Sequence, residues 1–298
     1  MAEFVLTLIA AEPCLPDAAR AVGDALLAAG AELDTLDVLA PGIACDLTFD
    51  GLACESAERA AHAVLDKLPI DFIAQPVAGR RKRLLVCDLE STIIENEMLD
   101  ELADGLGLRQ RVADITRRAM NGEIEFAAAV RERVALLKGL PERVLDEAAL
   151  RMRLTPGAAA LVATMRAHAA RTALVTGGFG VFANRIGAQL GFDVVVANEL
   201  EIDAGHLTGR AREPILGREA KLETLLRLTR DMGVTPAAAL AVGDGANDLP
   251  MIEAAGLGAA YRGKPTVAAR ARMRIDHTDL TALLFVQGYR NTEIVTAF

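Results

Sequence analysis

An apolar strand that ends in two closely spaced carboxylates constrains this chain more than any other feature. Residues 84–87 form the apolar run, and Asp88 and Glu90 follow it directly. Further apolar runs each precede a helical pattern, at residues 172–175, 194–197 and 240–242. Strands that alternate with helices predict an α/β fold with a doubly wound parallel sheet. Because ligands bind at the carboxyl ends of such strands, we expect the chemistry there.

A long, mostly helical stretch separates the first two predicted strands. It runs from about residue 95 to residue 153, which is more than a simple crossover between parallel strands needs. We therefore expect a helical cap over the carboxyl edge of the sheet. Residues 200–207 alternate about an Ala-Gly turn and predict a β-hairpin.

The first 78 residues follow a different pattern. Short apolar runs alternate with two alanine-rich helical patterns in the order βαββαβ, which is typical of a ferredoxin-like domain. The basic stretch at residues 80–83 follows, and we interpret it as a solvated linker in preference to a nucleic-acid patch. We place the border near residue 79, which gives domains 1–78 and 79–298.

Composition narrows the range of possible functions. The net charge of −9 disfavours non-specific nucleic-acid binding, which needs a concentrated positive surface. No apolar run approaches the roughly 20 residues of a membrane-spanning helix, and Glu3 before the apolar run at residues 4–11 argues against a secretory signal. The four cysteines have neither disulfide nor zinc spacing, so we expect a cytoplasmic protein with free thiols.

A second acidic segment completes a candidate metal site. The sequence GDGAND at residues 243–248 follows the run at 240–242, and it contains Asp244 and Asp248. A carboxylate that attacks a phosphate dianion meets repulsion, so the reaction needs a divalent cation and an acid for the leaving alkoxide. Hard oxygen ligands suit Mg²⁺, which we expect Asp88 and Asp244 to share.

Two further segments supply candidate phosphate ligands. Thr176 and Gly177 end another strand just before a helix, where backbone N–H groups favour an anion. Lys221, on a helical stretch, can place a positive charge beside the same phosphate. Taken singly, these residues also fit a helix cap, a turn and a surface lysine. Their occurrence at successive strand ends favours the functional interpretation.

Several motifs resemble a known superfamily. DLEST at 88–92, VTGG at 175–178, Lys221 and GDGAND at 243–248 are similar to the four motifs of the haloacid dehalogenase superfamily. Additional residues resemble the phosphoserine phosphatase family within it, and these are Glu97, Met120, Phe126, Arg133 and the segments GGFGVFANRIGAQLG and DLTALLFVQGY. The likeness covers residues 83–290 and implies a Rossmann-type core.

The resemblance implies a role for each matching residue. Asp88 would be the nucleophile and Glu90 the general acid and base, with Asp88, Asp244 and the Glu90 carbonyl as Mg²⁺ ligands and Asp248 as support. Thr176, Gly177 and Lys221 would hold phosphate, and Asn247 would contact phosphate or position nearby groups. Glu97 and Arg133 would hold the ammonium and carboxylate of the substrate. Met120 and Phe126 match substrate-side positions, although core packing is the alternative for them. Glu97 and Arg133 also fit solvent-facing positions on cap helices.

The sequence departs from the family at two positions. Glu90 stands where the family usually has aspartate, and its extra methylene moves the carboxyl by roughly 1.5 Å, a shift that can cost about a hundredfold in rate. Thr176 stands where serine is usual and keeps the hydroxyl. Neither change affects Asp88 or Asp244, so we favour a hydrolase over an inactive relative.

The expected activity is hydrolysis of O-phosphoserine to serine and phosphate through an aspartyl-phosphate, the last step of serine biosynthesis. The alternatives are a phosphatase or phosphotransferase for another small monoester, and a non-catalytic sensor of a phosphorylated amino acid. The N-terminal domain resembles an ACT module, which in other proteins binds amino acids and pairs between subunits. A serine sensor and a structural domain that supports a homodimer both stay open.

Overall fold

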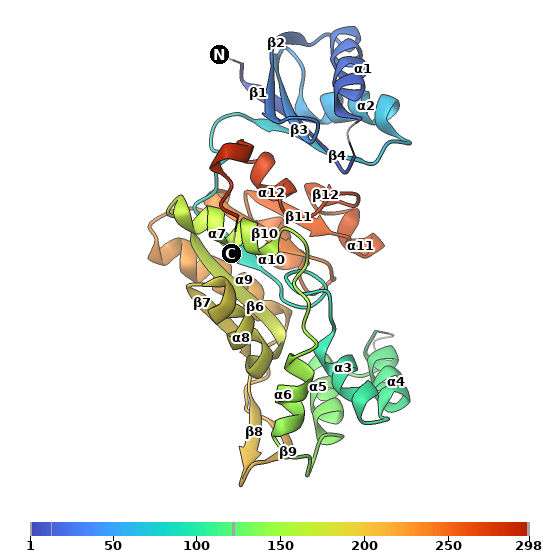
Figure 1. Ribbon diagram of the computed structural model, residues 1–298, viewed down its shortest axis with the longest axis vertical. Helices are drawn as coiled ribbons and strands as arrows, with labels where there is room; N and C mark the ends of the chain where they lie inside the picture. Colours follow the sequence, from blue (N-terminus) through green and yellow to red (C-terminus); the bar gives the residue numbers. More distant parts are fainter. Residues whose placement is uncertain (1, 13, 121–122, 297–298) are drawn as a thin grey trace.

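The computed structural model describes residues 2–12, 14–120 and 123–296, and it contains two main sheets of different type (Figure 1). The first is a four-stranded antiparallel sheet at the N-terminus, and the second is a six-stranded parallel sheet. No helix within these residues has both the length and the apolar composition needed to cross a membrane.

The N-terminal sheet has the predicted βαββαβ connectivity. Its elements are β1 (Phe4–Ala10), α1 (Leu15–Ala28), β2 (Glu32–Ala40), β3 (Ala44–Asp50), α2 (Cys54–Leu65) and β4 (Ile70–Pro76). The strand order is β2-β3-β1-β4. Alternate side chains such as Leu6 and Leu47 pack with Val22 of α1 in a separate apolar cluster. The opposite face of β1 carries Thr7 and Ile9, and Ile9 belongs to the core cluster of the larger part.

The parallel sheet has the strand order β12-β11-β10-β5-β6-β7. These strands are β5 (Leu84–Cys87), β6 (Arg171–Phe179), β7 (Val194–Asn198), β10 (Ala239–Gly243), β11 (Leu257–Tyr261) and β12 (Met273–Ile275). The four predicted strands are confirmed as the adjacent strands β10, β5, β6 and β7. The strands β11 and β12 were not predicted, because β11 is rich in glycine and alanine and β12 has three residues.

Helices cover both faces of this sheet, as predicted. Leu84 and Val86 of β5 face one apolar cluster, while Leu85 and Cys87 face another, so the strand is buried on both sides. The covering helices are α7 (Ala158–Ala167), α8 (Gly180–Leu190), α9 (Arg218–Asp231), α10 (Leu249–Ala254), α11 (Pro265–Ala268) and α12 (Ala282–Phe285).

The predicted cap consists of α3 (Met98–Gly105), α4 (Arg109–Met120), α5 (Phe126–Ala135) and α6 (Arg143–Ala149). A hairpin of β8 (Leu200–Asp203) and β9 (His206–Ala211) extends from the core beside it (Figure 1). The backbone N–H of Gly139 donates to the Leu207 carbonyl, and the Leu207 N–H donates to the Leu140 carbonyl, each at 2.8 Å. The hairpin is therefore joined to the cap by backbone hydrogen bonds.

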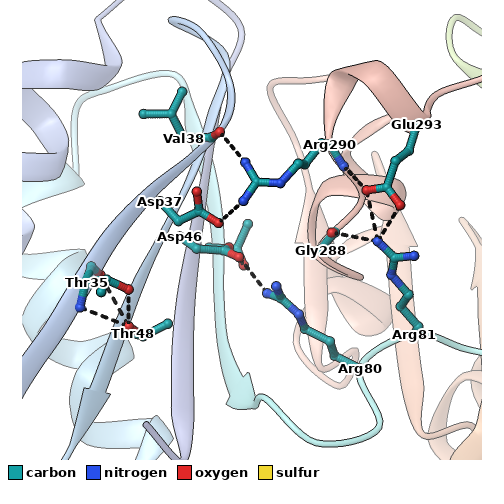
Figure 2. A network of polar contacts seen from close by, with 11 residues as sticks. Thr35, Asp37, Val38, Asp46, Thr48, Arg80, Arg81, Gly288, Arg290 and Glu293 are labelled. Atoms are coloured by element: carbon teal, nitrogen blue, oxygen red, sulfur yellow. Dashed lines mark hydrogen bonds and ion pairs between the residues drawn. The ribbon is translucent and has the colours of Figure 1, made fainter. Parts of the chain in front are cut away.

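Polar contacts connect the N-terminal sheet to the rest of the chain (Figure 2). Arg80 donates to Asp46 at 2.7 Å, and the Asp46 side chain is 2% exposed. Arg290 donates to Asp37 and to the Val38 carbonyl, while Arg81 pairs with Glu293. The interpretation of residues 80–83 as a solvated linker is thus wrong for Arg80, which is part of the contact between the two sheets.

A second buried carboxylate strengthens the same contact. Asp71 of β4 accepts hydrogen bonds from the backbone of Asp276, His277 and Thr278 and from the Thr278 hydroxyl. Gln75 donates to the Val286 carbonyl at 2.6 Å. These contacts hold β4 against the segments around β12 and α12.

Candidate active site

Three carboxylates meet at the carboxyl edge of the parallel sheet. The N–H of Asp88 donates to the Val242 carbonyl of β10 at 3.0 Å, so the ends of β5 and β10 are fixed side by side. Asp88, Asp244 and Asp248 are all buried, and each offers an oxygen within 4.8 Å of the others. The two acidic segments predicted from sequence therefore do converge.

This donor set fits a divalent cation. Burial, together with the negative charge of Asp248, raises the pKa of Asp88 well above its usual range. Burial also raises the pKa of Asp244. Clustered carboxylates in such surroundings need positive charge, and their hard oxygens are the ligands that Mg²⁺ and Ca²⁺ prefer.

Lys221 provides a fixed positive charge in this cluster. Its side chain is 2% exposed, and Nζ lies 2.6 Å from Oδ1 of Asp88 and 2.5 Å from Oδ1 of Asp248. Burial alone would lower the pKa of Lys221, but the two carboxylates outweigh burial and raise it. The alternative of a surface lysine is therefore excluded.

Glu90 lies where the cap meets the core. Its Oε1 accepts the backbone N–H of Met98, the first residue of α3, at 2.8 Å. Burial and the negative charge of Glu97 raise the pKa of Glu90 to about 7, although the Met98 N–H acts in the opposite direction. A carboxyl with this pKa exchanges protons near neutral pH, as a general acid and base must.

The end of β6 forms another wall of the site. Thr176 is buried, and its hydroxyl oxygen accepts the N–H of Gly178 at 2.9 Å, just before α8 begins at Gly180. A Cβ added at Gly177 would lie 3.1 Å from Cζ of Phe126, which is on α5. Phe126 of the cap therefore lies directly against the predicted phosphate-binding segment.

Asn198 was not predicted, yet it shapes this wall. Its Nδ2 donates to the Gly177 carbonyl at 2.8 Å, and its Oδ1 accepts the Leu216 N–H at 2.7 Å. Asn198 is the buried last residue of β7, and the available sequence signal was an asparagine directly after the apolar run at residues 194–197.

The two predicted carriers of substrate charge lie on the cap side. Glu97 accepts a hydrogen bond from the Ser91 hydroxyl at 2.8 Å, and desolvation by its surroundings raises its pKa although the residue is exposed. Arg133 of α5 is half-buried; burial lowers its pKa, while Glu90, Asp100 and Glu97 oppose that effect. The structure thus places both residues near Glu90.

The remaining predictions have different outcomes. Asn247 lies half-buried in the loop between Asp244 and Asp248. The side chain of Met120 falls outside the described part of the structure. Lys264 was missed: its Nζ lies 3.1 Å from Oδ2 of Asp244, and its N–H donates to the Asp244 carbonyl at 3.0 Å. Because β11 was not recognised, the lysine that follows this strand was not considered.

Comparisons with known proteins agree with this geometry. The haloacid dehalogenase-like hydrolase family matches residues 85–253. A phosphoserine phosphatase from Archaeoglobus fulgidus is 42% identical over 223 residues, which are 74% of this chain and 65% of the relative. The match therefore spans slightly less than two thirds of that protein.

Two other relatives match nearly the whole chain. A phosphoserine phosphatase from Streptomyces coelicolor is 35% identical over 296 residues, which are 98% of this chain and 72% of the relative. The crystal structure of a haloacid dehalogenase family hydrolase from Salmonella enterica serovar Typhi superimposes with a TM-score of 0.86 at 29% identity, covering 96% of this chain and 98% of the other. The chain belongs to the haloacid dehalogenase-like hydrolases and, among them, to the phosphoserine phosphatase family.

Proposed function

We propose that this protein hydrolyses O-phosphoserine to serine and phosphate. The observation that carries the proposal is the Lys221 ammonium between Asp88 and Asp248, with Asp244 beside them and Glu90 nearby. This arrangement supplies a carboxylate nucleophile, positive charge for a phosphoryl group and an acid of suitable pKa. The phosphoserine phosphatases among its relatives support the choice of substrate.

The proposed reaction has two displacement steps at phosphorus, and Glu90 transfers a proton in each step. A carboxylate oxygen of Asp88 attacks phosphorus, and Glu90 gives its proton to the seryl oxygen as the P–O ester bond breaks. Glu90, now ionised, takes a proton from a water molecule that attacks the aspartyl-phosphate. Phosphate leaves, and both Asp88 and Glu90 return to their starting protonation states.

Mg²⁺ is the proposed cofactor, held by Asp88, Asp244 and the backbone carbonyl of Glu90. When bound, it neutralises phosphate charge and so reduces the repulsion that a carboxylate nucleophile meets. Asp248 acts indirectly in this proposal, since it fixes Lys221 and accepts the N–H of Gly245 at 2.9 Å.

Substrate recognition is assigned to the walls of the site. Thr176, Gly177, Lys221 and Asn247 are proposed to hold phosphate, and Met120 and Phe126 to line the substrate side. Glu97 and Arg133 are proposed to pair with the ammonium and carboxylate groups, because opposite charges match the two charged ends of an amino acid.

The domain roles are also proposals. We divide the chain at residue 79 into an ACT-like domain and a phosphatase domain with its cap at about 95–153, in a cytoplasmic enzyme. The N-terminal domain is proposed either to bind serine or to support a homodimer. The edge strand β2 exposes Leu36 and Val38, which supports the second role. Light scattering tests for the homodimer, and titration with serine tests for serine binding.

Phosphate release from phosphoserine, with and without Mg²⁺, tests the proposed function. We expect turnover that requires Mg²⁺ and is lost in Asp88→Asn, while the exposed Asp24→Asn serves as a matched control. Preferred turnover of phosphothreonine or transfer to an added alcohol would assign another substrate or reaction. Tight phosphoserine binding without phosphate release would indicate the non-catalytic sensor.

A further inference from the structure

The carboxyl group of Glu90 is confined from two sides. One oxygen, Oε1, accepts the Met98 N–H from the cap at 2.8 Å. The other side faces β6, where a Cβ built at Gly178 would lie 2.9 Å from Oε2 and 3.2 Å from Cδ. The carboxyl therefore occupies the space that a side chain at position 178 would need.

Backbone conformation does not explain the glycine. Gly178 is not among the glycines with positive φ, so its backbone is open to residues with a side chain. Its N–H donates to the Thr176 hydroxyl, and any residue except proline would keep that donor. The closest neighbour of a side chain at this position would be the Glu90 carboxyl.

We propose that Gly178 is a positioning residue for Glu90. The absence of a side chain at position 178 leaves the room that the long side chain of glutamate at position 90 needs. A carbon 2.9 Å from a carboxylate oxygen is inside van der Waals contact, so a methyl group at 178 must displace the carboxyl. The displaced group loses its place between the Met98 N–H and β6. This inference rests on the proposed function, in which Glu90 moves the protons.

A shorter acid provides the diagnostic contrast. Aspartate at position 90 lacks one methylene, which withdraws the carboxyl by roughly 1.5 Å and leaves room for a methyl group at 178. Thr176 Oγ1 lies 3.2 Å from the same built Cβ, and this second contact is present with either acid. A double-mutant cycle cancels the Thr176 effect and isolates the coupling between positions 90 and 178.

The experiment measures kcat and KM for phosphoserine in four proteins: the wild type, Gly178→Ala, Glu90→Asp and the double variant. In the wild-type background we expect Gly178→Ala to lower kcat about 100-fold with KM changed less than about threefold, since the reacting group alone is misplaced. In the Glu90→Asp background we expect the same change to cost less than about fivefold. Equal losses in the two backgrounds would overturn the proposal.

Controls separate this proposal from the function on which it rests. Gly23→Ala is a matched control, because its added methyl group meets Leu33 and Leu47 at an ordinary 3.6 Å. Absence of phosphate release from the wild type counts against the proposed function alone. A crystal structure of Gly178→Ala tests the positioning without turnover: we expect the Glu90 carboxyl to have left the Met98 N–H, and an unmoved carboxyl would refute the pairing.

Discussion

The Lys221 ammonium lies 2.6 Å from Oδ1 of Asp88, although the two residues come from different parts of the fold, α9 and the end of β5. The same ammonium contacts Asp248, so one buried cation lies between two carboxyl groups and offsets part of their negative charge. The positive charge at the centre of the site is therefore part of the protein itself.

Removal of this charge should abolish most activity. In Lys221→Met we expect kcat for phosphoserine to fall at least about 100-fold, because a preorganised charge at the phosphoryl group is lost. Steady-state phosphate release at saturating substrate measures the effect, with the exposed Lys67→Met as control. A kcat within threefold of the wild type would contradict the assigned position of Lys221.

The pH dependence of kcat/KM should report Glu90. Its pKa is raised from 4.5 to about 7, so the acid form needed to protonate the leaving oxygen persists at neutral pH and is lost above it. We expect kcat/KM to fall about tenfold per pH unit on the alkaline side of 7. Initial rates from pH 5.5 to 9 test this, and the alkaline decline should be missing from the residual activity of Glu90→Gln. A constant value up to pH 9 in the wild type would argue against Glu90 as the acid.

Lys264 should weaken cation binding. Its ammonium lies 3.1 Å from Oδ2 of Asp244 and its side chain is 59% exposed, so the attraction is partly screened by solvent. Loss of this competing charge in Lys264→Met should tighten Mg²⁺ binding by about three- to tenfold, whereas Lys264→Arg should stay close to the wild type. Isothermal titration without substrate measures the affinity, and weaker binding in Lys264→Met would show that the lysine assists the metal.

Arg80 should be important for stability. Arg80→Met leaves the buried Asp46 without its cation, which should lower the free energy of unfolding by about 3–5 kcal/mol. The corresponding change at Arg81, whose side chain is 45% exposed, should cost less than about 1 kcal/mol. Urea unfolding compares the two variants, and an equal cost would argue against the buried pair. Asp46→Asn should recover part of the loss in the Arg80 variant.

The same pair predicts a pH effect on stability. Burial raises the pKa of Asp46, and Arg80 opposes that rise. A raised pKa in the folded state stabilises the protein below the unfolded pKa of 3.8, and the contribution disappears as pH rises through the folded value. Because Arg80→Met removes the opposing charge, its cost should be smaller at pH 4 than at pH 7. Urea midpoints at the two pH values, converted to free energies, test the sign.

The local sequence pattern was sufficient to predict the central strands of the parallel sheet. The run before Asp88 and the loop around Asp244 could be predicted because each joins a buried strand to acidic residues, and parallel strands bring such ends together. The antiparallel N-terminal sheet was likewise predicted from the order of its elements. By contrast, β11 and β12 consist of residues with weak strand preference or are very short, so their pairing with the sheet determines them.

Contacts between distant segments could not be predicted from the sequence. Arg80 and Asp46 are 34 residues apart in the chain, and nothing local to either residue indicates their pairing. Gly178 belongs to a recognised motif, yet its contact with Glu90 depends on the side-chain path of a residue from another strand end. Such properties arise from tertiary packing, which a linear pattern records only indirectly.

The backbone hydrogen bonds between Leu207 and residues 139–140 restrict how the site can open. The two segments that lead into and out of the cap also pair with each other, at the bridge between Ile94 and Leu154. With two attachments far apart in the chain, the helices cannot swing outward as a flap on one pivot. Outward movement of the helices then requires either that the hairpin bends with them or that the hydrogen bonds of Leu207 break.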